Sequence, residues 1–363
     1  MKVKIGNLTK IRTGKLDANA SSENGQYPFF TCSKEPLKIS SYSYDCECVL
    51  VAGNGDLNVK YYNGKFDAYQ RTYIIEDDSN GKLFMPYLYY FMDGYIDELR
   101  HQAIGGVIKY IKLGNLTDAL IELPDIETQK SIVDMLARVK GIITFRQQQL
   151  RKLDELVKAR FVEMFGDEQN PYKWEVVTVE EVADVQVGVV IKPAQYYTDK
   201  EHGVKTFRSL NIGPMYIKDT DWVYFTEEGN KKNSKSILKE NDLLIVRSGA
   251  PGTACVVTSE YVGCNAVDII IAHPNIKKVN PYFLCQYTNL PHGKKQIDVG
   301  IGGAAQQHFN VGKYNKVNLM LPPIDLQNEF ELFIKQLDKS KFVEIIGLLN
   351  LLIYTITKEV SPW

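Results

Sequence analysis

The sequence has no long apolar run and no excess of charge of either sign. No stretch approaches the roughly 20 apolar residues of a membrane span, and no apolar segment follows the polar start MKVKIGNLTKIRTGK. We therefore expect a cytoplasmic protein without a signal peptide or a membrane contact. Its 43 lysines and arginines balance 44 aspartates and glutamates, so attraction to nucleic acid has to come from local clusters.

Motifs for metal, nucleotide and catalytic chemistry are also missing. None of the six cysteines forms a C-x-x-C pair, and we expect reduced thiols. The sequence contains no G-x-x-x-x-G-K-[ST] loop and no H-E-x-x-H pair. Asn170-Pro171-Tyr172 lacks the second proline of the loop that grips a flipped adenine, so we interpret it as a helix end. We predict that the chain is no enzyme and binds no cofactor or metal of its own.

The most informative feature that is present is an internal repeat. Leu123-Pro-Asp-Ile-Glu-Thr-Gln129 recurs as Leu321-Pro-Pro-Ile-Asp-Leu-Gln327. In the same order, further positions of the first copy match positions of the second: Ile5, Leu8, Ile11 and Gly14 match Val179, Val182, Val185 and Gly188, Cys48–Ala52 matches Leu243–Arg247, Pro86-Tyr87 matches Pro281-Tyr282, Gly105-Gly106 matches Gly302-Gly303, and Leu113-Gly114 matches Val311-Gly312. The offset grows along the chain, which predicts an insertion in the second copy around Tyr196–Lys235.

A long helix is predicted after each copy. Apolar residues alternate at four and three positions, which is typical of a coiled-coil seam. In the first helix these positions are Ile132, Leu136, Val139, Ile143, Leu150, Leu153 and Val157. In the second they are Phe330, Ile334, Leu337, Ile345, Leu349 and Leu352. A helix of about 40 residues would be about 60 Å long, so we interpret the first as a spacer.

The string Leu153–Asp167 (LDELVKARFVEMFGD) resembles the central spacer of specificity subunits of type I restriction-modification systems. The Leu-Pro-x-Ile-x-x-Gln openings and the paired glycines are similar to that family as well. The resemblance covers the whole chain. It implies an α+β fold in which two globular target recognition domains are separated by two long antiparallel helices.

The resemblance also implies a function. Each domain would read one half of a split double-stranded DNA site, and the helices would dock methyltransferase subunits, two per chain. Those partners would use S-adenosylmethionine, and a motor-nuclease subunit would use ATP and Mg²⁺. We expect a recognition domain in residues 1–123, a spacer helix in 124–166, a second domain in 167–321 and a second helix in 322–363.

Candidate DNA contacts are amide, guanidinium, amine and hydroxyl groups near the short strands, because these groups read base edges and bind phosphates. In the first copy they are Lys60, Tyr61, Asn63, Lys65, Tyr69, Gln70, Arg71 and Lys109. In the second copy they are Arg208, Asn211, Lys231, Lys232, Lys235, Arg247, Ser248, Gln306 and Gln307. Each of these residues alone is also compatible with an ordinary surface loop.

Two other functions remain open from the sequence. One is a protein-interaction scaffold that carries two binding domains on a helical spacer. The other is a diverged methyltransferase, which the missing cofactor and Asn-Pro-Pro motifs disfavour. A methyltransferase gene beside this one would favour the DNA-recognition subunit.

Overall fold

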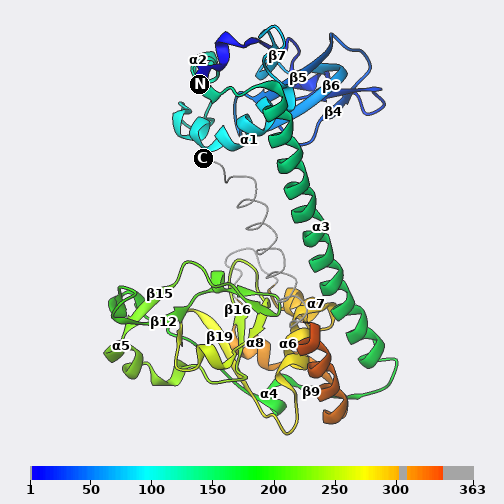
Figure 1. The fold of residues 1–363 in the computed structure, drawn as a ribbon. Helices are drawn as coiled ribbons and strands as arrows, with labels where there is room; N and C mark the ends of the chain where they lie inside the picture. Colours follow the sequence, from blue (N-terminus) through cyan, green and yellow to red (C-terminus); the bar gives the residue numbers. More distant parts are fainter. Residues whose placement is uncertain (1, 302–308, 338–363) are drawn as a thin grey trace. The chain divides into compact units, whose positions relative to one another are not determined.

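The structure is a computed structural model that describes residues 2–301 and 309–337 (Figure 1). It divides into two compact units, Met1–Arg146 and Gln147–Trp363. The boundary falls within α3 (Ile126–Phe165), a continuous helix of 40 residues. The predicted spacer, 124–166, brackets this helix to within two residues. We describe each unit by itself.

The first unit is built on a six-stranded sheet of order β2-β7-β5-β6-β3-β4. Its strands are β2 (Thr9–Thr13), β7 (Thr72–Asp77), β5 (Tyr44–Ala52), β6 (Val59–Ala68), β3 (Tyr27–Phe30) and β4 (Leu37–Ile39). Helix α1 (Met85–Gln102) packs against β5 and β6. Strand β1 (Lys2–Lys4) pairs with β8 (Leu120–Glu122), and α2 (Leu113–Thr117) precedes β8.

The second unit has two four-stranded sheets, β10-β19-β16-β17 and β11-β15-β12-β18. The strands of the first sheet are β10 (Ala183–Val187), β19 (Ile269–Pro274), β16 (Leu243–Val246) and β17 (Ala254–Val256). Those of the second are β11 (Tyr197–Thr198), β15 (Val223–Thr226), β12 (Gly203–Phe207) and β18 (Asn265–Ala266). The small pairs are β13 (Ile212–Gly213) with β14 (Tyr216–Ile217), and β9 (Glu175–Thr178) with β20 (Asn318–Leu321). In the described part of the chain, five short α-helices lie between the end of α3 and the helical residues 324–337: α4 (Val179–Val182), α5 (Glu227–Lys232), α6 (Pro281–Asn289), α7 (Pro291–Ile301) and α8 (Val311–Asn315).

Backbone hydrogen bonds confirm the sequence repeat near the start of each copy. The amide of Ile5 donates to the carbonyl of Ala119 at 2.9 Å, and the matching Val179 donates to Val317 at 3.1 Å. The carbonyls of Leu8 and Val182 each accept a bond at 2.8 Å from the segment after the neighbouring strand. The two units therefore share one chain path.

The matched positions 14 and 188 require glycine for the same steric reason. A Cβ atom on Gly14 would lie 2.1 Å from the carbonyl oxygen of Ala68, and one on Gly188 would lie 2.3 Å from that of Ala266. Atoms without a bond between them do not approach so closely. Each unit thus needs a residue without a side chain where two backbone segments cross.

The glutamine of each Leu-Pro-x-Ile-x-x-Gln motif is completely buried and caps a helix. The Gln129 Oε1 atom accepts from the backbone amide of Phe84, the N-cap of α1, at 2.8 Å. The Gln327 Oε1 atom accepts from the amide of Asn280, the N-cap of α6, also at 2.8 Å. In each unit the motif therefore ties the start of the helix that it opens to a second helix, α1 or α6, which explains why it occurs twice.

One predicted match is wrong by one residue. Strand β5 pairs Val49 with Ile75, and β16 pairs Leu243 with Ala272. Ile75 and Ala272 occupy matching positions in the two copies of the repeat. Their partner Leu243 therefore corresponds to Val49 and not to Cys48. Both strands are continuous apolar runs, and such runs carry no alternation that would fix a register from sequence.

The predicted insertion is present in the second unit. Ser43 donates a hydrogen bond to Asp67, and Ser236 donates the matching bond to Asn265. Only 13 positions separate Phe30 from Ser43, whereas 29 separate the matching Phe207 from Ser236. The additional residues include β13 and β14. The expectation of an insertion around Tyr196–Lys235 is confirmed.

The end of α3 packs into the core of the second unit. Phe161 and Phe165 pack against Phe283 and Phe330 at ring-centroid distances of 4.8–5.5 Å, with Phe161 stacked on Phe283 and the other three pairs edge to face. Arg160 Nη2 lies 3.3 Å from the Glu329 carboxylate. Residues 324–337 are helical, and Ile334 joins Val157 in this core.

Other predicted seam positions vary in burial. Leu136 and Ile143 are more than a third exposed, whereas Ile132, Val139, Leu150, Leu153 and Leu337 are half-buried or nearly so. Leu337 packs at the edge of the second unit's core, where Phe330 is buried. Ile345, Leu349 and Leu352 lie outside the described residues.

Candidate nucleic-acid interface

Three loops of the first unit meet at the end of its sheet where β5 ends and β7 begins. They are the Gly53-Asn54-Gly55 loop after β5, the Tyr69-Gln70-Arg71 turn after β6, and the segment Ile104–Tyr110 after α1. The Gly53 amide donates to the Arg71 carbonyl at 2.8 Å, and the Gly55 amide donates to the Lys109 carbonyl at 3.0 Å. We call these three loops the reading edge of the first unit.

The reading edge collects four of the predicted DNA contacts. Gln70, Arg71 and Lys109 are exposed, and Tyr69 is half-buried. Sequence positions as far apart as 71 and 109 meet here because both loops bond to the Gly53–Gly55 loop. An amide, a guanidinium and an ammonium group on one edge can contact base edges and phosphates.

The run Lys60–Lys65 does not form one surface, contrary to the expectation that it flanks the strands. It lies within β6, where successive side chains point to opposite faces. Lys60 lies on one face and bonds to Asn58, and burial lowers its pKa. Tyr61, Asn63 and Lys65 lie on the other face. Tyr61 donates to Glu47 at 2.6 Å, and the Lys65 ammonium lies over the Tyr42 ring.

The second unit repeats two loops of the reading edge with different chemistry, and the counterpart of the third loop, Ile104–Tyr110, lies outside the described residues. Arg247 occupies the position of Gly53, and its carbonyl accepts from Phe309 at 3.1 Å, just as Gly53 accepts from Ile111 at 2.9 Å. The Arg247 guanidinium is mostly buried, pairs with Asp268 and donates through Nε to the Phe309 carbonyl at 3.2 Å. Its donors are therefore largely used inside the unit. Ser248 lies beside it and is half-buried.

Arg208 and Asn211 also serve the fold of the second unit. Asn211 is fully buried, accepts from the Arg208 amide at 2.9 Å and donates to the Thr220 carbonyl at 2.6 Å. Arg208 Nη2 donates to the Asp221 carbonyl. These contacts hold the inserted segment, so Asn211 is not available to a ligand in this structure. Gln306 and Gln307 lie outside the described residues.

The predicted basic segment is exposed and lies on two adjacent short elements. Lys231 and Lys232 are in the last turn of α5, and Lys235 is in the 3₁₀ turn Ser234–Ser236. All three side chains are exposed, with Lys232 over the Tyr196 ring and Lys231 3.9 Å from Glu227. Exposed ammonium groups of this kind contribute little to folding and remain available for phosphates.

A partly buried chain of polar side chains holds this basic segment, and sequence reasoning missed it. Asp242 Oδ1 lies 2.6 Å from His273 Nδ1, and Gln186 Nε2 lies 2.8 Å from His273 Nε2. The same Gln186 amide donates to the Lys235 carbonyl at 2.5 Å. The three residues lie on different strands or their ends, so no local spacing in the sequence could have identified them.

Comparisons with known proteins agree with this repeated architecture. The model of the type I restriction modification DNA specificity domain matches residues 1–155 and 171–349. This chain belongs to that family. Both copies of the repeat are thus covered, and the gap falls at the end of α3.

Among curated family relatives, the chain is 38% identical over 156 residues to the type I restriction enzyme EcoDI specificity subunit of Escherichia coli. That match covers 43% of this chain and 34% of the relative. It is 24% identical over 267 residues to the MjaVIII specificity subunit of Methanocaldococcus jannaschii, with 67% and 62% covered. The matches therefore span about a third to three fifths of these relatives.

Two solved structures share the fold. The type I restriction-modification S subunit from M. genitalium superposes with a TM-score of 0.58 at 15% identity, covering 98% of this chain and 94% of that one. A chain from a structural study of complex assembly in the type I R-M system gives a TM-score of 0.54 at 15% identity, covering 99% and 95%. At this identity the likeness concerns the fold alone.

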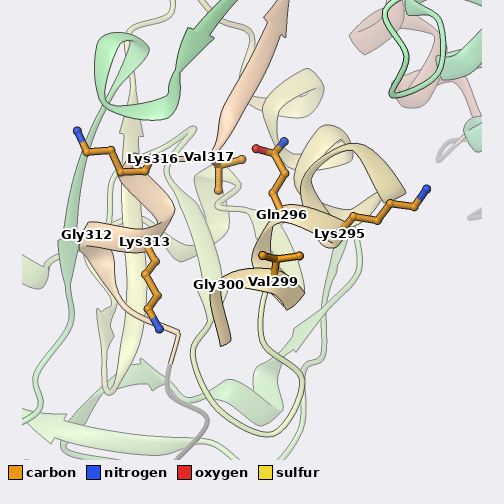
Figure 2. Close-up of a pocket in the computed structure, with 8 residues that line it drawn as sticks. All are labelled: Lys295, Gln296, Val299, Gly300, Gly312, Lys313, Lys316 and Val317. Carbon is orange, nitrogen blue, oxygen red and sulfur yellow. The ribbon is translucent and has the colours of Figure 1, made fainter. Parts of the chain in front are cut away.

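This family member also has a cavity of about 580 Å³ in the second unit, whose lining includes three lysines and two valines (Figure 2). It lies between α7 and α8, with Val299 and Val317 in its wall and Lys295, Lys313 and Lys316 around it. Lys295 pairs with Glu168, and Lys316 lies 2.5 Å from Glu180. The sequence did not predict this cavity, because its lysines are spread over two helices.

The described residues contain no cluster of three or more His, Cys, Asp or Glu side chains that could hold a metal ion. All six cysteines are free thiols, and four of them are buried. In the parts of the chain that the structure describes, no helix is both long enough and apolar enough to span a membrane.

Proposed function

We propose that this chain is a non-catalytic subunit that recognises a bipartite, asymmetric DNA sequence within a type I restriction-modification complex. The proposal rests on one observation above all. Two loops of the reading edge recur in the second unit on the same chain path, yet their side chains differ, with Gln70 and Arg71 in the first unit and Asp268 in the second. Two similar frames with different polar groups fit two half-sites of different sequence.

The partners belong to the same proposal. Methyltransferase subunits, two per chain, would dock on the two long helices and transfer the methyl group of S-adenosylmethionine to adenine. A motor-nuclease subunit would use ATP and Mg²⁺ to cut DNA. The division of labour fits a chain in which we found neither a nucleotide loop nor a methyltransferase motif in the sequence.

The alternative is a scaffold whose two units bind proteins. A scaffold would not explain why Gln70, Arg71 and the lysines of α5 are exposed, since exposed amide and cationic groups do not make a hydrophobic interface core. The two functions differ in one observable. A reading subunit confers sequence preference on its complex, whereas a scaffold does not.

The test is a DNA titration with the chain alone and with its methyltransferase subunit. With a formal net charge of −1, the isolated chain attracts DNA weakly. We expect tight sequence-specific binding by the complex and weak binding by the chain alone. Tight specific binding by the chain alone would contradict the dependence on a partner. A complex without any sequence preference would overturn the proposed function and support the scaffold.

A further inference from the structure

The segment Ile104–Tyr110 at the reading edge of the first unit exposes apolar side chains at its tip. Val107 is 104% exposed and Ile108 is 63% exposed, which are among the largest exposures of apolar residues in the described chain. Neither belongs to any of the apolar core clusters of the described residues. Exposing β-branched apolar side chains to water is unfavourable unless another molecule covers them.

Backbone hydrogen bonds fix the base of this segment, so its tip projects from the first unit in a defined position. Ile104 and Tyr110 exchange both backbone hydrogen bonds, at 3.0 and 2.8 Å. The amide of Ile111 donates to Gly53 at 2.9 Å, which ties the segment to the reading edge. Gly105 has a φ of 121°, and a Cβ atom there would lie 2.6 Å from the Ile108 carbonyl, so the turn needs glycine.

Charges around the tip favour DNA over a protein partner. Residues 103–112 carry Lys109 and Lys112 and no acidic residue, and Arg71 lies on the neighbouring turn. The acidic neighbour Asp56 is already offset by Arg100 at 3.4 Å and Lys34 at 3.8 Å. An apolar tip surrounded by cations matches a base stack flanked by phosphates.

We propose that Val107 and Ile108 form a wedge that enters the stack between two base pairs of the half-site read by the first unit. This inference rests on the proposed function and deepens it. Proteins that insert apolar side chains between base steps partly unstack and kink the duplex. Pyrimidine–purine steps deform most easily, so the wedge selects sequence at a step where it makes no hydrogen bond.

The wedge belongs to one half of the molecule only. In the second copy the paired glycines Gly302-Gly303 are followed by Ala304 and Ala305. Alanine methyl groups are too short to separate stacked base pairs. The DNA distortion is therefore expected in one half-site and not in the other.

The test places 2-aminopurine, a base that fluoresces when it is unstacked, at successive positions of both half-sites. The full chain in complex with its methyltransferase subunit binds each duplex. We expect a fluorescence increase of several-fold at one step of the first half-site only. The V107A/I108A double variant removes this increase and weakens binding by roughly tenfold. The matched control Leu37→Ala, an exposed leucine on edge strand β4, retains both.

Each of the following outcomes would contradict the proposal that Val107 and Ile108 form a wedge. Specific binding by the wild-type complex without any unstacked step leaves the proposed function intact and excludes the wedge. Failure of the wild-type complex to bind DNA specifically excludes both. If the double variant stays folded but no longer assembles with the methyltransferase subunit, as measured by light scattering, the tip is a protein-docking site instead.

Discussion

At the scale of single residues, the two buried glutamines best explain why a seven-residue motif recurs. Gln129 Nε2 donates to the carbonyls of Lys82 and Pro124 at 2.8 and 2.9 Å, while its Oε1 accepts from Phe84. Gln327 donates to Pro322. A side chain of this length with both a donor and an acceptor is needed to join these backbone groups.

Replacing Gln129 with alanine should therefore destabilise the first unit. The change leaves the Phe84 amide and two carbonyls without their partner in a buried place. We expect the free energy of unfolding to fall by about 2–4 kcal/mol, measured by urea denaturation. Gln148→Ala, at an exposed position on the same helix, is the control and should have almost no effect. Equal losses for both variants would contradict the structural role of the motif.

Exposure divides the predicted DNA contacts into two groups, for a physical reason. Arg71 and Lys109 are exposed at one edge, as a contact residue must be. Asn211 and Arg247 have equally suitable chemistry but satisfy backbone and carboxylate groups inside the second unit. Composition indicates which groups can bind DNA, but burial depends on contacts between residues distant in sequence.

At the scale of elements, the repeat was predictable because its markers are geometrically special. Gly14 and Gly188 stand where chains cross, and Gln129 and Gln327 stand where helices are capped. The registers of β5 and β16 were not predictable, because both strands are uniformly apolar. Strand β6 was not predicted either, because its polar residues resemble a loop although they alternate between two faces.

The basic segment around α5 should act through charge alone. Replacing Lys231, Lys232 and Lys235 with alanine is expected to weaken DNA binding and to reduce the salt dependence, by roughly 0.9 in the log–log slope for each phosphate that is no longer neutralised. The recognised sequence should stay the same, since phosphate contacts position a protein without specifying bases. Binding titrations over a range of salt concentrations measure this. Lys277→Ala, exposed on the same unit, is the control, and an unchanged slope in the triple variant would refute the contact.

At the scale of the whole molecule, α3 belongs to both units. It begins beside the first unit's capping glutamine and ends in the second unit's core, where Phe161 and Phe165 are buried. A fragment of residues 1–166 would expose this aromatic end. Because a second copy offers the same surface, we expect the fragment to dimerise by an isologous contact. Light scattering should give twice the monomer mass.

A shorter fragment, residues 1–146, is the matched control for this dimer. It ends at the boundary of the first unit and lacks Val157, Phe161 and Phe165. We expect it to be monomeric, since the apolar end of α3 is removed. If light scattering gave the same number of chains per particle for both fragments, the end of α3 would not drive association.

The central claim is that each unit reads its own half of one DNA site. The most direct measurement is methylation-sensitive sequencing of DNA from cells that express the full chain with its methyltransferase subunit. The wild-type motif should be split and asymmetric. The double variant Gln70→Ala/Arg71→Ala, at the reading edge of the first unit, should alter bases in one half and leave the other half and the spacing unchanged. A continuous motif, or a variant that alters both halves together, would contradict this account.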